Sequence, residues 1–423
     1  MSDVLQAIRG MNDVLPAETP YWQQVESVCR EVAAQYAYRE IRFPLLEQTA
    51  LFQRSIGSTT DIVEKEMYTF NDRNGDSLTL RPEGTAGCVR AGIEHGLLHN
   101  QIQRLWYMGP MFRHERPQKG RLRQFHQFGI EALGLAGPDI DVEIILIAKR
   151  ILERLNLLTG VTLDINTLGC SEERRAYQQK LVDYFTAHQN KLDEDCQRRL
   201  TTNPLRILDS KNPDMQSLIA NAPLLTDFIQ GDSKKHFDHL CELLRSQHIS
   251  FHINPRLVRG LDYYCLTAFE WVTTELGAQG SVCGGGRYDG LVEALGGKAA
   301  PAVGFSMGLE RLVLLMQQKF SSSFSPDFYV IMDEAAESHV LALCEKIRTQ
   351  FPALRIEMNA GFGKFATQLK RADKSGAAQA LIVGENELRA QTVTVKNLKT
   401  TEQKTISEKD LFLLLGGLRH PAT

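Results

Sequence analysis

The sequence lacks the features that mark secreted and membrane-spanning proteins. Its 423 residues include eight cysteines, scattered from Cys29 to Cys344, and no two of them form a C-x-x-C pair. This pattern predicts reduced thiols rather than a disulfide framework. No apolar run approaches the length of a membrane span, and the first residues, MSDVLQAIRGMNDVLP, contain no apolar signal-peptide core. We therefore expect a cytoplasmic protein with no membrane partner.

An excess of charge of one sign is also missing. The chain has 48 Lys and Arg against 51 Asp and Glu, which gives a formal net charge of −3 and a pI of about 6.4. Any surface that binds nucleic acid must then be local rather than global. The composition, 43% hydrophobic and 23% charged, is ordinary for a globular protein, and the length predicts more than one domain.

Several common catalytic motifs are absent as well. No G-x-x-x-x-G-K-[ST] phosphate loop occurs, so any bound ATP must be held in another way. The GFGKFA segment at Gly361 imitates a dinucleotide fingerprint, but a plain turn explains it better. The paired histidines lack the acidic residue or cysteines of zinc sites, and we expect no protein-bound metal. No Ser-His-Asp spacing or marked nucleophilic cysteine stands out.

The clearest positive signal lies between residues 104 and 133. Two apolar, aromatic runs, 104–112 and 124–133, predict antiparallel strands. The connecting segment, RHERPQKGRLR, holds five Arg or Lys and one Glu, and its proline and glycine disfavour regular structure. A basic loop can simply be solvated. However, Arg113 at the strand exit can also present a bidentate donor to a phosphate, and Gln127 and Glu131, four residues apart, must face the same side of a sheet.

Polar groups also stand at other junctions between predicted elements. The segment RPEGTAG leaves a predicted hairpin strand and opens a helix, so Glu83 and Thr85 lie at a strand-to-helix corner, where ligands are often bound. Arg259 lies in LVRGLDYY and Arg311 in GFSMGLERL, each beside a glycine at the end of an apolar segment. Either arginine could form a surface ion pair, or the two could clamp a polyphosphate together with Arg113.

Periodicity divides the chain into three regions. Apolar residues at helical spacing predict an amphipathic helix from Pro20 to about Tyr36, followed by a short strand at 40–43. Asn74-Gly75 predicts a hairpin, and residues 139–158 a helix. Residues 170–252 are polar and helical, as expected of an insertion within a domain spanning 1–325. The serine-rich segment 319–327 is the predicted linker, and 326–423 alternates as a small α/β domain.

These segments together resemble the class II aminoacyl-tRNA synthetases. The helix and strand before Pro44, the strand-loop-strand with Arg113, and GFSMGLERL resemble the three class signatures. LVRGLDYY at 257–264 and SVCGGGRYDGL at 281–291 are similar to peptides of the bacterial histidyl-tRNA synthetases. The resemblance covers nearly the whole chain. It implies an α+β fold: an antiparallel sheet with flanking helices and a helical insertion, followed by a small α/β anticodon-binding domain.

The resemblance also implies roles for individual residues. Arg113 and Arg259 are the expected catalytic groups at the α-phosphate, and Arg311 would bind the far phosphates or adenine. The expected histidine-binding residues, besides Arg259, are Glu83, Thr85, Gln127, Glu131, Tyr263 and Tyr264. The expected contacts to the tRNA acceptor end are Arg116, Gln118, Lys119, Arg121 and Arg123.

The implied function is histidine–tRNA ligation in a homodimer, with histidine, ATP accompanied by Mg2+, and tRNA(His) as partners. Positioning and charge stabilisation suffice for adenylate formation, which suits the missing nucleophile. Two alternatives remain. One is a non-catalytic, synthetase-like regulatory subunit of histidine biosynthesis, and the other is a synthetase for a different amino acid.

Overall fold

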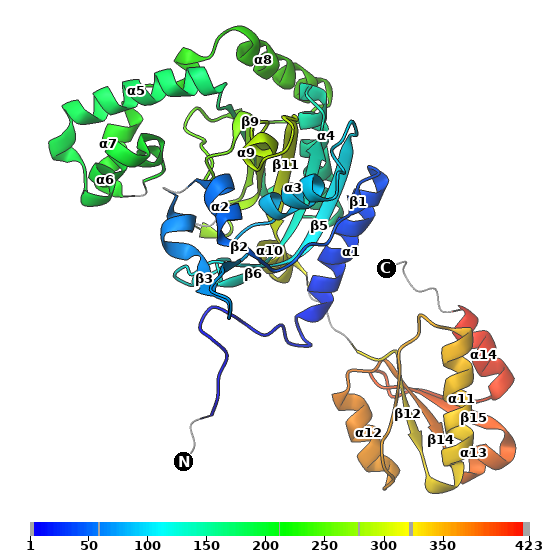
Figure 1. The fold of residues 1–423 in the computed structure, drawn as a ribbon. Coiled ribbons are helices and arrows are strands. Elements are labelled where there is room, and N and C mark those ends of the chain that lie inside the picture. Colours follow the sequence, from blue (N-terminus) through cyan, green and yellow to red (C-terminus); the bar gives the residue numbers. More distant parts are fainter. Residues whose placement is uncertain (1–3, 58–59, 211, 278–279, 321–324, 418–423) are drawn as a thin grey trace. The chain divides into compact units, whose positions relative to one another are not determined.

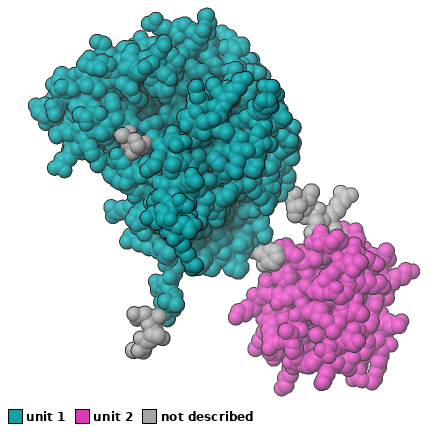
Figure 2. Space-filling model, in the orientation of Figure 1, with its two compact units in different colours: residues 1–322 teal, residues 323–423 magenta. Residues whose placement is uncertain are grey.

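The computed structural model describes residues 4–57, 60–210, 212–277, 280–320 and 325–417. The chain divides into two compact units, residues 1–322 and 323–423 (Figure 2). The division falls within the predicted linker, residues 319–327, of which 321–324 lie outside the described part. No helix in the described ranges is both long enough and apolar enough to cross a membrane.

The first unit is built on an eight-stranded sheet (Figure 1). Its strands, in spatial order, are β1 (Arg39–Glu40), β5 (Gln103–Phe112), β6 (Gln124–Leu133), β11 (Ala302–Gly308), β10 (Ser281–Arg287), β9 (Cys265–Val272), β7 (Thr162–Thr167) and β8 (His252–Ile253). The six central strands are antiparallel, whereas the short edge strands β1 and β8 pair in parallel. The expected antiparallel sheet is confirmed, and β5 and β6 pair over ten residues each, as predicted.

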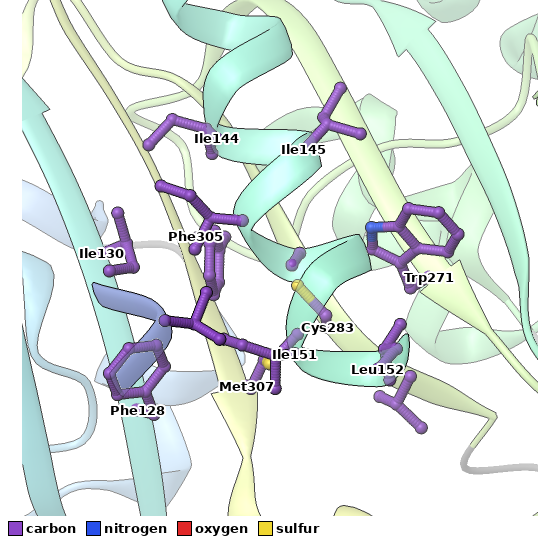
Figure 3. Packing of buried hydrophobic residues seen from close by; sticks show 14 of the residues in the cluster. Phe128, Ile130, Ile144, Ile145, Ile151, Leu152, Trp271, Cys283, Phe305 and Met307 are labelled. Carbon is purple, nitrogen blue, oxygen red and sulfur yellow. The ribbon is translucent and has the colours of Figure 1, made fainter. Parts of the chain in front are cut away.

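Helices cover one face of this sheet. They are α1 (Thr19–Gln35), α4 (Pro138–Arg154), α8 (Gly231–Ser246) and α10 (Leu309–Lys319). Figure 3 shows Ile144 and Ile151 of α4 on the side of Phe128 of β6 and Phe305 of β11, and Leu152 on the side of Trp271 of β9. Truncating one of these buried isoleucines to alanine costs about 2–5 kcal/mol in a typical core. The packing fixes the sheet, so that alternate strand residues must point to the opposite face.

Smaller elements cover that opposite face. Helix α3 follows the strand-to-helix corner, and a three-stranded sheet in the order β2-β4-β3 lies beside it. The bounds are β2 (Leu46–Gln48), α2 (Thr49–Ile56), β3 (Tyr68–Asn71), β4 (Ser77–Leu80), α3 (Thr85–Glu94) and α9 (Leu291–Ala294). Gly75 takes a φ of +92° in the turn between β3 and β4, which confirms the predicted hairpin.

The polar segment that starts at residue 170 is helical, as expected. It contains α5 (Ser171–Ala187), α6 (Glu194–Thr202) and α7 (Pro213–Ala220), joined by 3-10 turns that include Pro204–Asp209. These helices form a separate group in Figure 1. Helix α8 differs because Leu240 and Leu244 belong to the core cluster beneath the main sheet. The last helix of the predicted insertion therefore packs as part of the sheet's helical layer.

The second unit is a five-stranded α/β fold, as predicted. Its strands, in spatial order, are β13 (Ile356–Met358), β12 (Phe328–Met332), β14 (Gln379–Val383), β15 (Thr392–Asn397) and β16 (Gln403–Ser407). Its helices are α11 (Glu337–Gln350), α12 (Phe365–Lys374), α13 (Glu385–Ala390) and α14 (Glu408–Gly417). The first three strands are parallel, and β15 and β16 are antiparallel.

Candidate active site

A cavity of about 540 Å³ opens on the α3 side of the main sheet. Its walls come from segments that are far apart in the sequence: the 81–85 corner, the loop between β5 and β6, the loop before β9, and strands β6, β10 and β11. The predicted site residues that line it are Glu83, Thr85, Arg113, Arg121, Gln127, Arg259, Tyr263, Tyr264 and Arg311. The fold thus brings together most of the polar residues that the sequence singled out.

Five arginines line the cavity: Arg113, Arg121, Arg256, Arg259 and Arg311. Burial lowers the pKa of Arg113, Arg121 and Arg311 from the ordinary value, and Arg113 and Arg121 add repulsion at Arg311. Because a guanidinium remains protonated in proteins, burial leaves the positive charge on each of these side chains in place. Such a cluster favours an anion with several oxygens, since each guanidinium can donate to two of them.

Backbone carbonyls and an aromatic ring aim two of these arginines. Nε of Arg113 donates to Pro82 O at 2.8 Å, and its guanidinium lies 5.3 Å from the centre of the Phe125 ring. Nε of Arg311 donates to Gly120 O at 3.0 Å, and Nη1 donates to Ser281 O. These contacts orient both side chains before a ligand arrives.

Arg259 is held differently, by an acid that the sequence analysis missed. Burial opposes the charge on Arg259, but the Glu270 carboxylate outweighs it and raises the arginine pKa above the ordinary value. A Cβ at Gly284 would lie 2.5 Å from Nη2 of Arg259, so a side chain at this position would displace the guanidinium from its present place. Nε of Arg259 is buried and has no hydrogen-bond partner among the described residues.

Glu83 and Gln127 supply acceptors in the same cavity. The Glu83 carboxylate accepts from the backbone N–H groups of Thr85 at 2.6 Å and Ala86 at 2.9 Å, which caps α3. Burial nonetheless raises the pKa of Glu83. Oε1 of Gln127 is buried and accepts no hydrogen bond within the described part of the chain. A buried unpaired acceptor is costly, so this oxygen is suited to a ligand that donates, such as an ammonium group.

Glu131 lies on the same face of β6 but is not among the residues that line the cavity. Its side chain is 1% exposed and accepts from the hydroxyls of Thr85 at 2.7 Å, Tyr107 at 3.2 Å and Tyr288. Burial raises the pKa of Glu131 to about 8, although the hydroxyls of Tyr288 and Thr85 oppose the shift. The carboxyl therefore forms the floor beneath the cavity, and its role toward histidine stays a prediction.

The basic loop between β5 and β6 contains both exposed and partly buried side chains. Arg116, Gln118 and Lys119 are exposed, and the latter two line a separate cavity of about 420 Å³. Arg123 instead supports the loop, because its Nε donates to Glu115 O at 3.2 Å and its N–H to Gly10 O at 2.7 Å. Arg121 pairs with buried Glu115 and lines the main cavity. The predicted acceptor-end contacts thus fall into an exposed group and a partly buried group.

One basic residue of the glycine-rich peptide is structural. Arg287 is fully buried and pairs with the fully buried Asp141, while its Nη atoms donate to Leu135 O at 2.9 Å and Gly137 O at 3.0 Å. His236 and Thr267 also contact Asp141, at 2.8 and 2.5 Å. This network ties β10 to α4 and leaves Arg287 outside the cavity lining.

Sequence analysis missed three functional candidates besides Glu115. Glu270 is a lone acid in the apolar strand FEWV, which was a usable signal. Tyr107 and Tyr288 carry no such signal, because aromatic residues in strands are ordinary core residues. Their hydroxyls matter only because the fold brings them to Glu131.

Comparisons with known proteins identify the family of the chain. Residues 10–312 match the family model described as histidyl-tRNA synthetase, and residues 327–415 match that of an anticodon binding domain. The apo histidyl-tRNA synthetase of S. aureus is 33% identical, with a TM-score of 0.80, over 97% of this chain and 100% of that one.

Two more distant structures share the fold. A Nostoc sp. histidyl-tRNA synthetase is 20% identical, with a TM-score of 0.69 over 98% of this chain and 99% of that one. A Bacillus halodurans structure described as an ATP phosphoribosyltransferase regulatory subunit/histidyl-tRNA synthetase is 20% identical, with a TM-score of 0.65 over 91% and 99%. Because the first family model matches more than half of the 423 residues, the chain belongs to the histidyl-tRNA synthetase family.

Proposed function

We propose that this chain is a histidine–tRNA ligase, which forms histidyl-adenylate from histidine and ATP and then transfers histidine to the 3′ end of tRNA(His). The observation that carries the proposal is the cavity itself. It gathers five arginines around one space, and Oε1 of Gln127 is buried there without a hydrogen-bond partner among the described residues. A polyphosphate matches the arginines, and an amino acid with a protonated amino group matches the acceptor at Gln127.

The phosphates are placed among Arg113, Arg259 and Arg311. The first two flank the α-phosphate, and Arg311 takes the far phosphates or the adenine. Mg2+ accompanies ATP as part of the substrate and adds positive charge at the phosphates. Among the described residues, no group of three or more His, Cys, Asp or Glu side chains could hold a metal ion.

Histidine is placed on the Glu83 side of the cavity. Its ammonium group donates to Glu83, Thr85 and Gln127, and its imidazole extends toward Tyr264 and the Glu131 carboxyl below. The rings of Tyr263 and Tyr264 lie 4.7 Å apart and form an apolar wall for a planar ligand. These contacts leave the histidine carboxylate directed toward the arginines.

Adenylation then needs no nucleophile from the protein. A carboxylate oxygen of histidine attacks the α-phosphorus, the bond to the bridging oxygen breaks, and pyrophosphate leaves with that electron pair. Negative charge on the α-phosphate oxygens rises in the transition state. The guanidinium of Arg259 is fixed by Glu270 and has a free Nε–H, so it stabilises this charge without rearranging.

The second step and the remaining partners follow from the other surfaces. A ribose hydroxyl at the tRNA 3′ end attacks the activated carbonyl, and AMP leaves. The exposed Arg116, Gln118 and Lys119 are placed to meet the acceptor end, with Arg121 and Arg123 supporting the loop. The second unit binds the anticodon. We further propose a homodimer involving α1, in the cytoplasm, with a catalytic region at 1–325, an insertion at 170–252 and an anticodon-binding region at 326–423.

ATP–pyrophosphate exchange, measured with each amino acid in turn, tests the proposal. We expect exchange with histidine alone. Exchange with another amino acid would refute the specificity, and no exchange with any would favour the regulatory role that the B. halodurans description includes. Light scattering of the purified protein tests the dimer, since a monomer in active preparations would contradict it.

A further inference from the structure

The loop that carries Arg259 is held from outside the sheet. Residues 254–264 join β8 to β9, and Arg259, Tyr263 and Tyr264 of this loop line the main cavity. A second cavity of about 630 Å³ lies behind the loop, between it and helices α5 and α6. Arg259 and Tyr264 line both cavities, so the loop separates one cavity from the other.

Polar contacts from the helical segment cross this second cavity. Nη2 of Arg206, in the Pro204–Asp209 turn, donates to Gly260 O, the carbonyl directly after Arg259. Nη1 of Arg174, on α5, donates to Tyr264 O. Nδ2 of Asn203 donates to Asp262 Oδ1 at 3.2 Å. The helical segment thus holds the loop just before β9 through two backbone carbonyls, at 260 and 264, and through the Asp262 side chain.

The loop also reaches back to the helices. The guanidinium of Arg256 donates to three carbonyls at the end of α7 and just after it: Ala220 O at 3.1 Å, Ala222 O at 2.6 Å and Pro223 O at 3.1 Å. On the other side, the N–H of Asp262 donates to Ile56 O at 3.1 Å at the end of α2. Contacts to the helical segment therefore occur on both sides of Arg259 along the chain.

We infer that Arg206 and Arg174 are positioning residues for adenylation, which set the direction of the Arg259 guanidinium by holding the carbonyls at 260 and 264. The inference rests on the proposed function and adds that the α5–α7 helices control the rate of the first chemical step. A loop with cavities on both sides lacks the tight packing that would otherwise fix its backbone. Charge-assisted bonds from the two arginines supply that restraint.

The test compares Arg206→Ala, Arg206→Lys and Arg174→Ala with the wild type in pre-steady-state adenylate formation. We expect each alanine variant to lower the rate constant about tenfold, the effect of losing one charged hydrogen bond, with ATP and histidine affinities within about twofold. Lysine keeps one donor and should recover part of the rate. Arg198→Ala is the matched control, because Arg198 on α6 is exposed and pairs with Asp195.

A double-mutant cycle separates positioning from a general structural effect. In an Arg259→His background, Arg206→Ala should cause no further loss, because the side chain that it positions is absent. An equal fractional loss in both backgrounds would overturn the inference, as would a loss confined to substrate affinity. Thermal unfolding identifies a variant that fails to fold, and Arg206→Lys then carries the test.

The two proposals fail in different ways. A wild-type chain without histidine-dependent exchange would refute the proposed function. An active wild type with a normal rate constant in Arg206→Ala and Arg174→Ala would refute the positioning role alone. Hydrogen exchange gives an independent reading: peptides covering 254–264 should exchange faster in Arg206→Ala than in Arg198→Ala, and equal exchange would contradict the restraint.

Discussion

Replacing Glu131 with glutamine should change how the stability of the first unit depends on pH. The Glu131 carboxyl is 1% exposed, and burial raises its pKa from an ordinary 4.5 to about 8. Glutamine has nearly the same volume, and its oxygen can accept from the hydroxyls of Thr85 and Tyr107. The substitution therefore removes a titrating group and leaves the surrounding packing in place.

The sign follows from the protons bound in each state. Below pH 4.5 the carboxyl is protonated in both the folded and the unfolded chain and contributes no pH dependence. Between pH 4.5 and about 8 the unfolded chain releases this proton while the folded chain keeps it, so the free energy of unfolding falls as pH rises. At 1.36 kcal/mol per pH unit, the loss accumulates to about 5 kcal/mol, and it levels off above the folded pKa.

Glutamine does not titrate, so the variant should lack this decline. The free energy of unfolding of Glu131→Gln minus that of the wild type should rise by about 3–5 kcal/mol between pH 5 and pH 8.5. Urea unfolding followed by tryptophan fluorescence measures it, because Trp22, Trp106 and Trp271 all lie in the first unit. Glu64→Gln, at an exposed position, controls for exchanging a carboxyl for an amide.

Parallel stability curves for the wild type and Glu131→Gln across this pH range would refute the reasoning. They would mean that the three hydroxyls stabilise the carboxylate enough to offset its burial. Infrared spectroscopy provides a second measurement. The wild type should show the carbonyl stretch of a protonated carboxylic acid at pH 6 and lose it above pH 8. The Glu131→Gln variant should lack this pH-dependent band.

Three further outcomes are expected from the proposed function. Arg259→His should lower the rate of adenylate formation on the order of a hundredfold while ATP and histidine bind nearly as before, and a pre-steady-state rate equal to the wild type would remove Arg259 from catalysis. Arg116→Ala with Lys119→Ala should weaken tRNA charging and flatten its salt dependence with little effect on exchange, whereas equal losses in both assays would place the loop in the ATP site. A chain ending at Ser325 should still form adenylate but charge tRNA poorly, and a folded, dimeric truncated protein without adenylation would show that the second unit shapes the cavity.

Local patterns were sufficient to predict the elements that frame the site. The β5–β6 pair follows from two apolar runs separated by a proline- and glycine-containing loop, and strand alternation places Gln127 and Glu131 on one face. Element ends were less predictable. The expected strand at 40–43 is β1 (Arg39–Glu40), and the expected helix at 139–158 ends at Arg154, since tertiary contacts decide where pairing stops.

Contacts between distant residues could not be predicted from local patterns. Tyr288 is 157 positions from Glu131, and Arg287 is 146 positions from Asp141. Nothing near Tyr288 in the sequence distinguishes its hydroxyl from that of a core tyrosine. The same holds for α8, whose amphipathic pattern predicts a helix but not the surface on which it packs. The resemblance to known synthetases named candidate site residues, most of which line one cavity, but not Glu270, the acid that holds Arg259.

The surroundings of an arginine indicate whether it stabilises the fold or binds a ligand. Arg287 has a carboxylate on each side and two backbone carbonyls, and its acid partners raise its pKa despite burial. Arg113 and Arg311 line the main cavity and donate Nε to backbone carbonyls, and burial lowers the pKa of both. Removing Arg287 would leave the Asp141 charge buried and should cost stability. Removing Arg113 relieves repulsion at Arg311, so that loss should fall on ATP binding instead, and a large loss of stability in Arg113→Ala would contradict this distinction.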